Sequence, residues 1–134
     1  SPLIGKNDDS FGERFPDMSN VYNKALVAKI EESAKENNIT MQKGVYVQAS
    51  GPNYKSPAEV RMFGLLGADA VGMSTACEAM VASYLGMSVC GISMVSNKAV
   101  GLTDEPVTHE EVKRVALASA NKLGKIIVGL INKL

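Results

Sequence analysis

The sequence has little of several residue types that mark particular classes of protein. It has no tryptophan, one histidine and two cysteines in 134 residues, and its 14 basic residues are balanced by 14 acidic ones. Because no basic excess is available to neutralise phosphates, the composition argues against a nucleic-acid partner. The apolar runs are too short and too interrupted to span a bilayer, so we expect no membrane partner either.

The cysteines and the histidine do not form a metal-binding pattern. Cys77 and Cys90 fall in different expected elements, with no C-x-x-C motif and no companion histidines. A zinc site gathers such ligands at close spacing, so we expect no metal. The two cysteines form either one disulfide or two reduced core thiols, and we favour the thiols of a cytoplasmic protein.

The sequence does contain alternating strand and helix patterns, and its 46% of hydrophobic residues suits one globular domain with a moderate core. The first twenty residues are rich in Gly, Pro, Asp, Asn and Ser and indicate a loop. We expect helices over residues 19–37, 56–66, 75–86 and 108–134, strands over 44–50, 68–73 and 88–96, and a polar loop over 97–107. The run SVCGISMVS at 88–96 is almost continuously apolar, which is typical of a strand covered on both faces. The alternation predicts an α/β fold of three layers, a mostly parallel or mixed sheet flanked by helices.

Three of the helix starts carry capping signals. In the stretch SPAE, Ser56 can cap the helix, proline occupies its first turn, and Glu59 can reach back to the cap. Thr75 with Glu78, and Thr108 with Glu111, have the spacing of the same capping box.

Ligands of such sheets bind beyond the carboxyl ends of the strands, which directs attention to residues 46–55, 71–75 and 96–98. Ser74 and Thr75 open a helix, where they either bind an anion or merely cap the helix. Asn97 offers a donor and an acceptor suited to an amide-like edge, or forms an Asx turn. Tyr54 and Phe15 either stack on a flat ligand or pack.

Two further residues have plain structural interpretations. His109 stands at a first helical position, where an imidazole is usually exposed and idle. Met73 is of the type that fills cores. The chain has no G-x-G-x-x-G or Walker pattern to cradle phosphates. The residues alone therefore indicate an α/β ligand-binding domain, an enzyme, with an anion site near Ser74.

Several motifs together resemble the trimeric purine nucleoside phosphorylases. They are GVYVQASGPNYKSPAEVRMFGLLGADAVGMST, then SMVSNKA and THEEV, and early in the chain FGERFPDMS. The resemblance covers essentially the whole chain but only the C-terminal part of the family's domain, somewhat under half. It implies phosphorolysis of purine (2′-deoxy)ribonucleosides to free base and ribose 1-phosphate by a cytoplasmic transferase of purine salvage. Inorganic phosphate is the co-substrate and no cofactor is implied.

The resemblance also implies a role for individual residues. Ser74 helps hold phosphate, Asn97 bonds purine N7 and O6 and supports the leaving group, and His109 hydrogen-bonds the 5′-hydroxyl. The remaining residues line the nucleoside pocket: Tyr46 near the sugar, Met73 beneath the ribose, Val71, Gly72 and Tyr54 around the base, and Ser96 where the family usually has Thr. Phe15 resembles the aromatic that reaches into the neighbouring subunit's site, which implies a homotrimer.

Lys55 departs from the resemblance, because the family usually has a glutamate there that accepts from purine N1–H and the 2-amino group. A lysine is a donor only and is positively charged. Asn97 favours a 6-oxopurine such as inosine or guanosine, while Lys55 weakens the case for guanosine. A phosphorylase for adenosine-type or 5′-methylthioadenosine-type nucleosides is one alternative, and a non-catalytic nucleoside-binding homologue is the other.

Residues 1–134 thus correspond to the C-terminal part of one phosphorylase domain. The family's other phosphate ligands belong to the N-terminal part, and half a sheet exposes an unpaired edge and an uncovered apolar face. We therefore expect this piece not to fold or catalyse alone. We expect it to work with the N-terminal half of the same protein, as one part of a nicked or split chain broken in the loop before Pro2.

Overall fold

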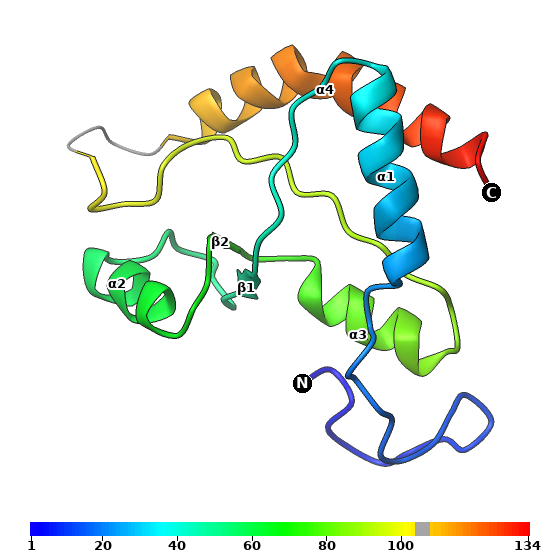
Figure 1. Ribbon diagram of the computed structural model, residues 1–134. Helices are drawn as coiled ribbons and strands as arrows, with labels where there is room; N and C mark the ends of the chain where they lie inside the picture. The colour runs from blue at the N-terminus through cyan, green and yellow to red at the C-terminus, as the bar shows by residue number, and fades with distance from the viewer. Residues whose placement is uncertain (104–107) are drawn as a thin grey trace.

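The computed structural model describes residues 1–103 and 108–134, and the last part of the polar loop expected over 97–107 lies outside them. A long N-terminal loop leads into four helices and two short strands (Figure 1). In chain order the elements are α1 (Lys24–Glu36), β1 (Tyr46–Gln48), α2 (Pro57–Leu65), β2 (Ala70–Gly72), α3 (Ala76–Tyr84) and α4 (His109–Ile131). All four expected helices and two of the three expected strands are therefore present, and both strands are shorter than predicted.

Helix α1 begins later than the residue 19 predicted from its apolar spacing. The Asn23 side chain caps it by accepting hydrogen bonds from the backbone N–H groups of Ala25 and Leu26. Ser19 is engaged elsewhere, because its own N–H and hydroxyl both donate to Asp17 Oδ1, at 2.8 and 2.6 Å. These local bonds lower the pKa of Asp17. The helix starts only after Tyr22 because Tyr22 forms a parallel bridge with Val89, and the Asn23 N–H donates to the Val89 carbonyl oxygen at 2.7 Å.

The capping box of α2 is confirmed in full. Glu59 N–H donates to Ser56 Oγ, and Glu59 Oε2 accepts from the Ser56 N–H at 2.7 Å. Thr108 caps α4 by accepting from the Glu111 N–H at 3.3 Å. The box predicted at Thr75 is wrong: Thr75 has φ +84° and makes no side-chain cap bond. Thr75 instead forms a tight turn, in which the Ala76 N–H donates to the Ser74 carbonyl oxygen at 3.1 Å, and its hydroxyl lies 3.2 Å from that of Ser74.

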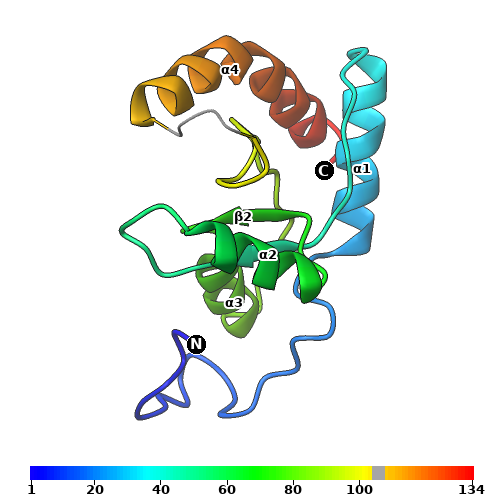
Figure 2. The ribbon, with the colours of Figure 1, turned by 90° about the vertical axis from the view of Figure 1, so that its left-hand side faces the viewer.

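Strands β1 and β2 pair in parallel, with Tyr46 opposite Ala70 and Gln48 opposite Gly72. The parallel pairing is as predicted. In Figure 2 the strand pair lies between α4, above it, and α3, below it. The pairing brings the carboxyl ends of both strands to the same edge, from which α2 and α3 are entered.

The strand expected over 88–96 is not formed in the described structure. The segment is extended but joins another segment only at one parallel bridge, between Val89 and Tyr22. Val95 is 69% exposed, contrary to the expectation of a strand covered on both faces. A strand requires a ladder of hydrogen bonds to a neighbour, and an apolar run without such a neighbour stays an unpaired segment.

The core is small and lies where α1 packs on the C-terminal part of α4. Ile30, Ala34 and Ile126 are buried there, with Ile39, Met41, Cys90, Ile92 and Leu130 packed around them. The wholly buried Ser33 donates to the Ile126 carbonyl oxygen at 2.9 Å, and its hydroxyl fills the space beside Gly129 where a side chain would stand. Burial of the polar hydroxyl is thus compensated by a hydrogen bond.

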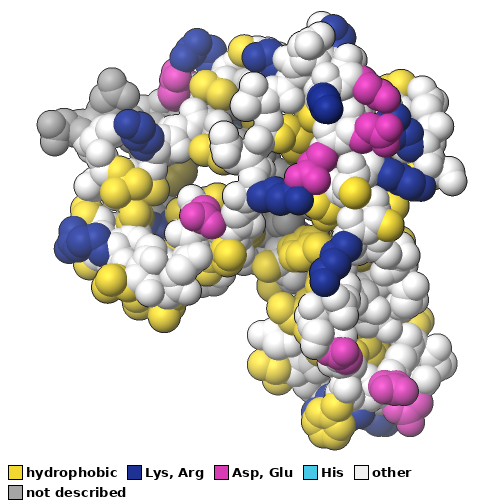
Figure 3. All heavy atoms as spheres, viewed as in Figure 1, with side chains coloured by type: hydrophobic (Ala, Val, Ile, Leu, Met, Phe, Trp, Pro, Cys, Tyr) yellow, Lys and Arg dark blue, Asp and Glu magenta, His cyan; other side chains and the backbone are white. Residues whose placement is uncertain are grey.

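Much apolar surface is left open. The chain exposes 9628 Å², whereas a folded monomer of its mass exposes on the order of 6,800 Å². Figure 3 shows apolar side chains at the surface over α2 and along the notch between α2 and the N-terminal loop. Leu65 of α2, Leu66 at its C-terminal cap and Leu117 of α4 are 90%, 76% and 78% exposed. Within residues 1–103 and 108–134, no helix is long and apolar enough to cross a membrane.

Candidate functional site

The loops that follow β1 and β2 meet at one edge of the sheet. The Ala49 N–H donates to the Gly72 carbonyl oxygen at 2.9 Å, which extends the strand pairing by one residue. One step further on, the Met73 sulfur occupies the position that a Cβ on Gly51 would take. Gly51 itself has φ +68°, a conformation that glycine adopts without strain. Met73 is therefore held against the loop that carries Tyr54 and Lys55.

Tyr46 and Gly72 are in direct contact across the strand pair. The Tyr46 hydroxyl stands where a Cβ on Gly72 would lie, and the ring carbon Cζ is 2.8 Å from that position. The Tyr46 phenol also lies close enough to Tyr22 to contribute, after burial, to raising the pKa of Tyr22. Tyr46 is thus half-buried in a slot that only a glycine at 72 leaves open.

Ser74 and Thr75 stand at the N-terminal end of α3 with their hydroxyls 3.2 Å apart. The cap of α3 is a residue that sequence reasoning missed: Gln48 Oε1 accepts from the Cys77 N–H at 2.8 Å. Gln48 is the last residue of β1 and lies 29 positions before Cys77, so no local signal connects the two. Because Gln48 supplies the cap, the exposed Ser74 hydroxyl is left beside the positive end of the helix dipole.

Asn97 makes two local hydrogen bonds. Its Oδ1 accepts from Ser96 Oγ at 2.6 Å, and its Nδ2 donates to the Lys98 carbonyl oxygen at 2.7 Å. A side-chain amide has two hydrogens and two lone-pair sites, so one of each stays available within the described structure. The segment then approaches α2, since a Cβ on Gly101 would lie 2.7 Å from Pro57 Cβ. Among the described bonds of Asn97 there is none from the Ala99 N–H to Oδ1, as an Asx turn requires, and the remaining donor and acceptor suit an amide-like edge.

Tyr54 and Lys55 lie in the loop between β1 and α2, and Tyr54 is 43% exposed. Lys55 is half-buried and lies near Glu59 of the capping box. Hydrogen bonds from the Ser56 N–H and hydroxyl lower the pKa of Glu59, and the positive charge of Lys55 adds to this effect. The ammonium therefore has a carboxylate in its neighbourhood, one turn into α2.

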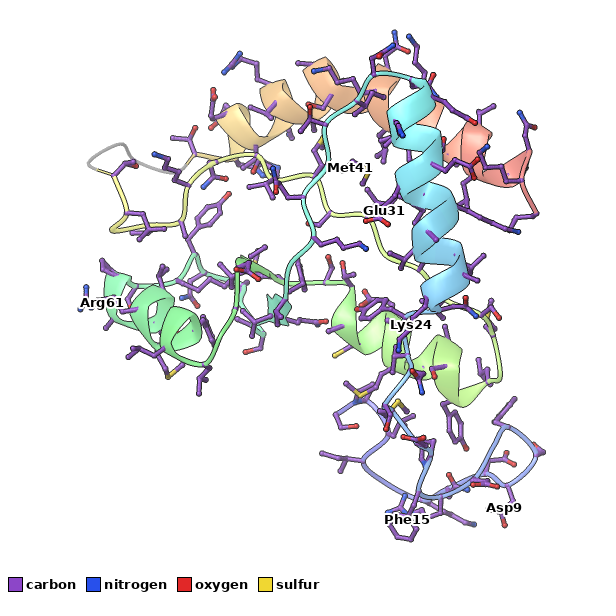
Figure 4. All side chains as sticks on the ribbon, viewed as in Figure 1. Asp9, Phe15, Lys24, Glu31, Met41 and Arg61 are labelled. Carbon is purple, nitrogen blue, oxygen red and sulfur yellow. The ribbon has the colours of Figure 1, made fainter. Side chains whose placement is uncertain are left out.

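Two further predicted site residues are exposed on other segments. Phe15 is 88% exposed and lies on the N-terminal loop at the bottom of the view in Figure 4, well away from Arg61 of α2. His109 is the exposed first residue of α4. Val71, by contrast, is half-buried in β2 beside Gly72. The described residues thus bring Tyr46, Val71, Gly72, Met73 and Ser74 together, with the loop of Tyr54 and Lys55 against Met73.

The groups at this edge are suited to binding and polarising a ligand. Within the described ranges, no group of three or more His, Cys, Asp and Glu residues is placed to hold a metal ion. Hydroxyls and a helix N-terminus face one end of the edge, and an amide and an ammonium lie on its neighbouring segments. Such an arrangement can hold an anion and a flat polar molecule side by side.

Comparison with known proteins gives one family and a consistent set of relatives. The sequence pattern of the Phosphorylase superfamily matches residues 1–132. The chain is 51% identical over 131 residues to Purine nucleoside phosphorylase 1 of Bacillus subtilis (strain 168), covering 96% of this chain and 48% of that protein. It is 39% identical to the purine nucleoside phosphorylase of Mycobacterium leprae (strain TN), covering 98% of this chain and 45% of that protein.

Solved structures agree with the sequence relatives. The Schistosoma mansoni purine nucleoside phosphorylase in complex with adenosine superposes with a TM-score of 0.93 at 36% identity, covering 98% of this chain and 49% of that one. The same organism's enzyme in complex with inosine gives a TM-score of 0.92 at 38% identity, covering 98% and 48%. The resemblance noted in the sequence and the nucleoside phosphorylase-like α/β fold are therefore confirmed. The chain spans about half the length of the relatives it matches.

Proposed function

The chain belongs to the Phosphorylase superfamily, and we propose that it supplies one part of the active site of a purine nucleoside phosphorylase. The observation that carries the proposal is the convergence of Tyr46, Gly72, Met73 and Ser74 at one sheet edge, in a chain 51% identical to a purine nucleoside phosphorylase. Solved relatives bind inosine, hypoxanthine and guanosine, which supports a purine nucleoside as the substrate.

The proposed reaction is phosphorolysis. A phosphate oxygen forms a bond to C1′ of the sugar while the bond from C1′ to purine N9 breaks, and its electron pair leaves with the base. The base then takes up a proton, so the products are the free purine and ribose 1-phosphate. Catalysis requires that phosphate be held below the sugar and that the negative charge growing on the purine be stabilised.

The residues of this chain suit those tasks. Ser74, beside the positive end of α3, holds phosphate, and the free donor and acceptor of Asn97 face the N7 and O6 edge of the base. The pocket around the nucleoside is completed by Tyr46, Tyr54, Lys55, Val71, Gly72, Met73 and Ser96. His109 bonds the 5′-hydroxyl, and Phe15 of a neighbouring subunit closes the site. The assembly that we propose is a homotrimer. It acts in the cytoplasm, in purine salvage.

The open apolar surface supports a further protein part that completes the domain. The area in excess of a folded monomer is on the order of 2,800 Å², more than one partner of a standard interface buries. The relatives are about twice as long as this chain. We assign the part that covers this apolar surface to the N-terminal half of the same protein, which also contributes the other phosphate ligands. The chain on its own is then inactive.

One residue favours a second candidate within the same reaction. Lys55 offers donors only, so it suits a base whose recognised edge carries acceptors rather than N–H groups. A 6-aminopurine has an unprotonated N1, and one solved relative holds adenosine. Phosphorolysis of adenosine-type nucleosides is therefore the alternative substrate range for this chain.

The test is release of base from inosine by the complete assembly, with and without inorganic phosphate. We expect hypoxanthine and ribose 1-phosphate only when phosphate is present. Equal release without phosphate would indicate a hydrolase and reject the proposal. Purine binding with no turnover under either condition would indicate a non-catalytic homologue, and a preference for adenosine over inosine would select the second candidate.

A further inference from the structure

The middle of the long N-terminal loop, residues 7–12, is attached to the end of α3 by the phenol of Tyr84. The hydroxyl of Tyr84, the last residue of α3, lies 2.9 Å from Asn7 Oδ1 and 3.2 Å from the carbonyl oxygens of both Asp8 and Gly12. These partners precede Tyr84 by 72 to 77 positions. One side chain therefore joins two parts of the chain that are remote in sequence.

Asn7 is oriented to receive this hydroxyl. Its Nδ2 donates to Asp9 Oδ1 at 2.6 Å and to the Gly12 carbonyl oxygen at 3.1 Å. Because both amide hydrogens are then used, Oδ1 must face Tyr84 as the acceptor. A hydroxyl donates one hydrogen, and Asn7 Oδ1 is the nearest of its three acceptors, so the Tyr84 hydroxyl and the Asn7 amide form one satisfied network.

The loop backbone also closes over the Tyr84 ring. A Cβ on Gly12 would lie 2.6 Å from the Tyr84 carbonyl oxygen and 2.9 Å from its Cε2, so only glycine allows this approach. The loop has further order of its own: Asp8 accepts from the Ser10 N–H at 3.0 Å and from its hydroxyl at 2.7 Å. The attachment at Tyr84 thus holds a segment that is already folded locally.

The attached segment presents Phe15 outward. Arg14 donates to the Gly5 carbonyl oxygen at 2.7 Å, and its guanidinium carbon lies 5.9 Å from the centre of the Phe15 ring. Figure 4 shows Phe15 at the end of the loop, turned away from the rest of the molecule. An aromatic ring held fully exposed on an ordered loop is suited to packing against another protein surface.

We infer that Tyr84 is a positioning residue, which fixes the N-terminal loop through Asn7 and thereby sets the direction of Phe15 toward a neighbouring subunit. The anchoring of the loop depends only on this chain's own contacts. The consequence for a neighbouring active site rests on the proposed function. Helix α3 then connects the two, since its first turn follows Ser74 and its last residue holds the loop.

The test uses the variant Tyr84→Phe in the intact protein, which removes the hydroxyl and keeps the ring. Hydrogen exchange of the Ser10 and Phe11 amides, which bond to Asp8 within the loop, should become roughly tenfold faster, as expected for the loss of one hydrogen bond. Asn7→Ala removes the nearest acceptor of the hydroxyl together with two bonds inside the loop, so it should speed exchange of these amides at least as much. Tyr22→Phe is the matched control, since its hydroxyl makes no hydrogen bond among the described residues, and it should leave these amides unchanged.

The second readout separates positioning from general damage. When Phe15 is less well directed, the KM for inosine should rise about threefold or more, while kcat and the KM for phosphate stay unchanged. The reason is that packing on the nucleoside stabilises the bound substrate and the transition state equally. Unchanged loop exchange in Tyr84→Phe would overturn the inference, and so would faster exchange with an unchanged KM. Failure of the proposed function would show instead as absence of phosphorolysis in the unaltered protein, and the exchange data would then decide the anchoring alone.

Discussion

The Tyr46 hydroxyl lies in the space that a side chain on Gly72 would occupy, so these two residues can only be accommodated together. The contact joins the two paired strands at the edge where the candidate site is formed. It places a phenol beside Met73 and Ser74 by packing alone. Because no hydrogen bond is involved, no sequence motif predicts the contact.

Gly72→Ala should therefore displace the Tyr46 phenol. Overpacking of this kind costs about 1–3 kcal/mol of folding free energy, and with Tyr46 shifted we expect kcat/KM for inosine to fall by roughly tenfold or more. Denaturant unfolding and steady-state kinetics measure the two effects. Gly64→Ala is the control, since its Cβ would meet nothing within 4 Å and a helical alanine stabilises by about 0.5–1 kcal/mol. Equal behaviour of the two variants would contradict the assignment.

Lys55→Glu should restore recognition of the purine edge that carries the N1–H and the 2-amino group. We expect kcat/KM for guanosine to rise relative to inosine by roughly tenfold, the value of one hydrogen bond to a charged group. Lys55→Met removes the charge without adding an acceptor and should bring no such gain. Both variants should raise the pKa of Glu59 toward its ordinary value, because Lys55 helps to lower it. A gain in Lys55→Met would show that the acceptor is not the cause.

Asn97→Asp should move the preference from 6-oxopurine to 6-aminopurine nucleosides. A carboxylate accepts from an exocyclic amino group but has no N–H to offer a 6-oxo group. The ratio of kcat/KM for adenosine over inosine should rise by roughly tenfold or more. Asn97→Ala, which loses donor and acceptor together, should lower both activities. An unchanged ratio in Asn97→Asp would place Asn97 outside the base pocket.

Ser56→Ala should weaken the start of α2 and change its response to acid. Two hydrogen bonds from Ser56 lower the pKa of Glu59 in the folded protein, the larger effect coming from the backbone N–H, and Ser56→Ala removes only the bond from the hydroxyl. Their stabilisation is therefore present above the unfolded pKa of Glu59 and is lost as the pH falls through its lower, folded value. At neutral pH we expect Tm to fall by a few degrees. The deficit should shrink in acid, and a constant deficit from neutral to acidic pH would contradict this.

The parts of the fold that could be predicted from sequence are those decided within a few residues. The capping box of α2 is complete between Ser56 and Glu59, so the start of α2 follows from residues within one turn of it. The start of α1 was missed because its apolar spacing could not show that Tyr22 pairs with Val89, and Asn23 caps the helix after that bridge.

The candidate site was predictable in part. Alternating strands and helices were enough to expect that residues after β1 and β2 meet at one edge, because parallel strands leave their carboxyl ends on the same side. The unpaired segment over 88–96 was not predictable, since its apolar composition is the same whether or not a neighbouring strand is present to receive its hydrogen bonds.

The sequence by itself determined the start of α2, the parallel α/β order and the strand-end location of the candidate residues. The capping box of α2 acts on adjacent backbone, and the other two follow from the alternation of strand and helix patterns. Only the tertiary structure decided that Gln48 caps α3, that Tyr84 holds Asn7 and that Tyr46 fills the space beside Gly72. These contacts join residues up to 77 positions apart. They exist because packing places the two groups within bonding distance, a condition that no local pattern of residues expresses.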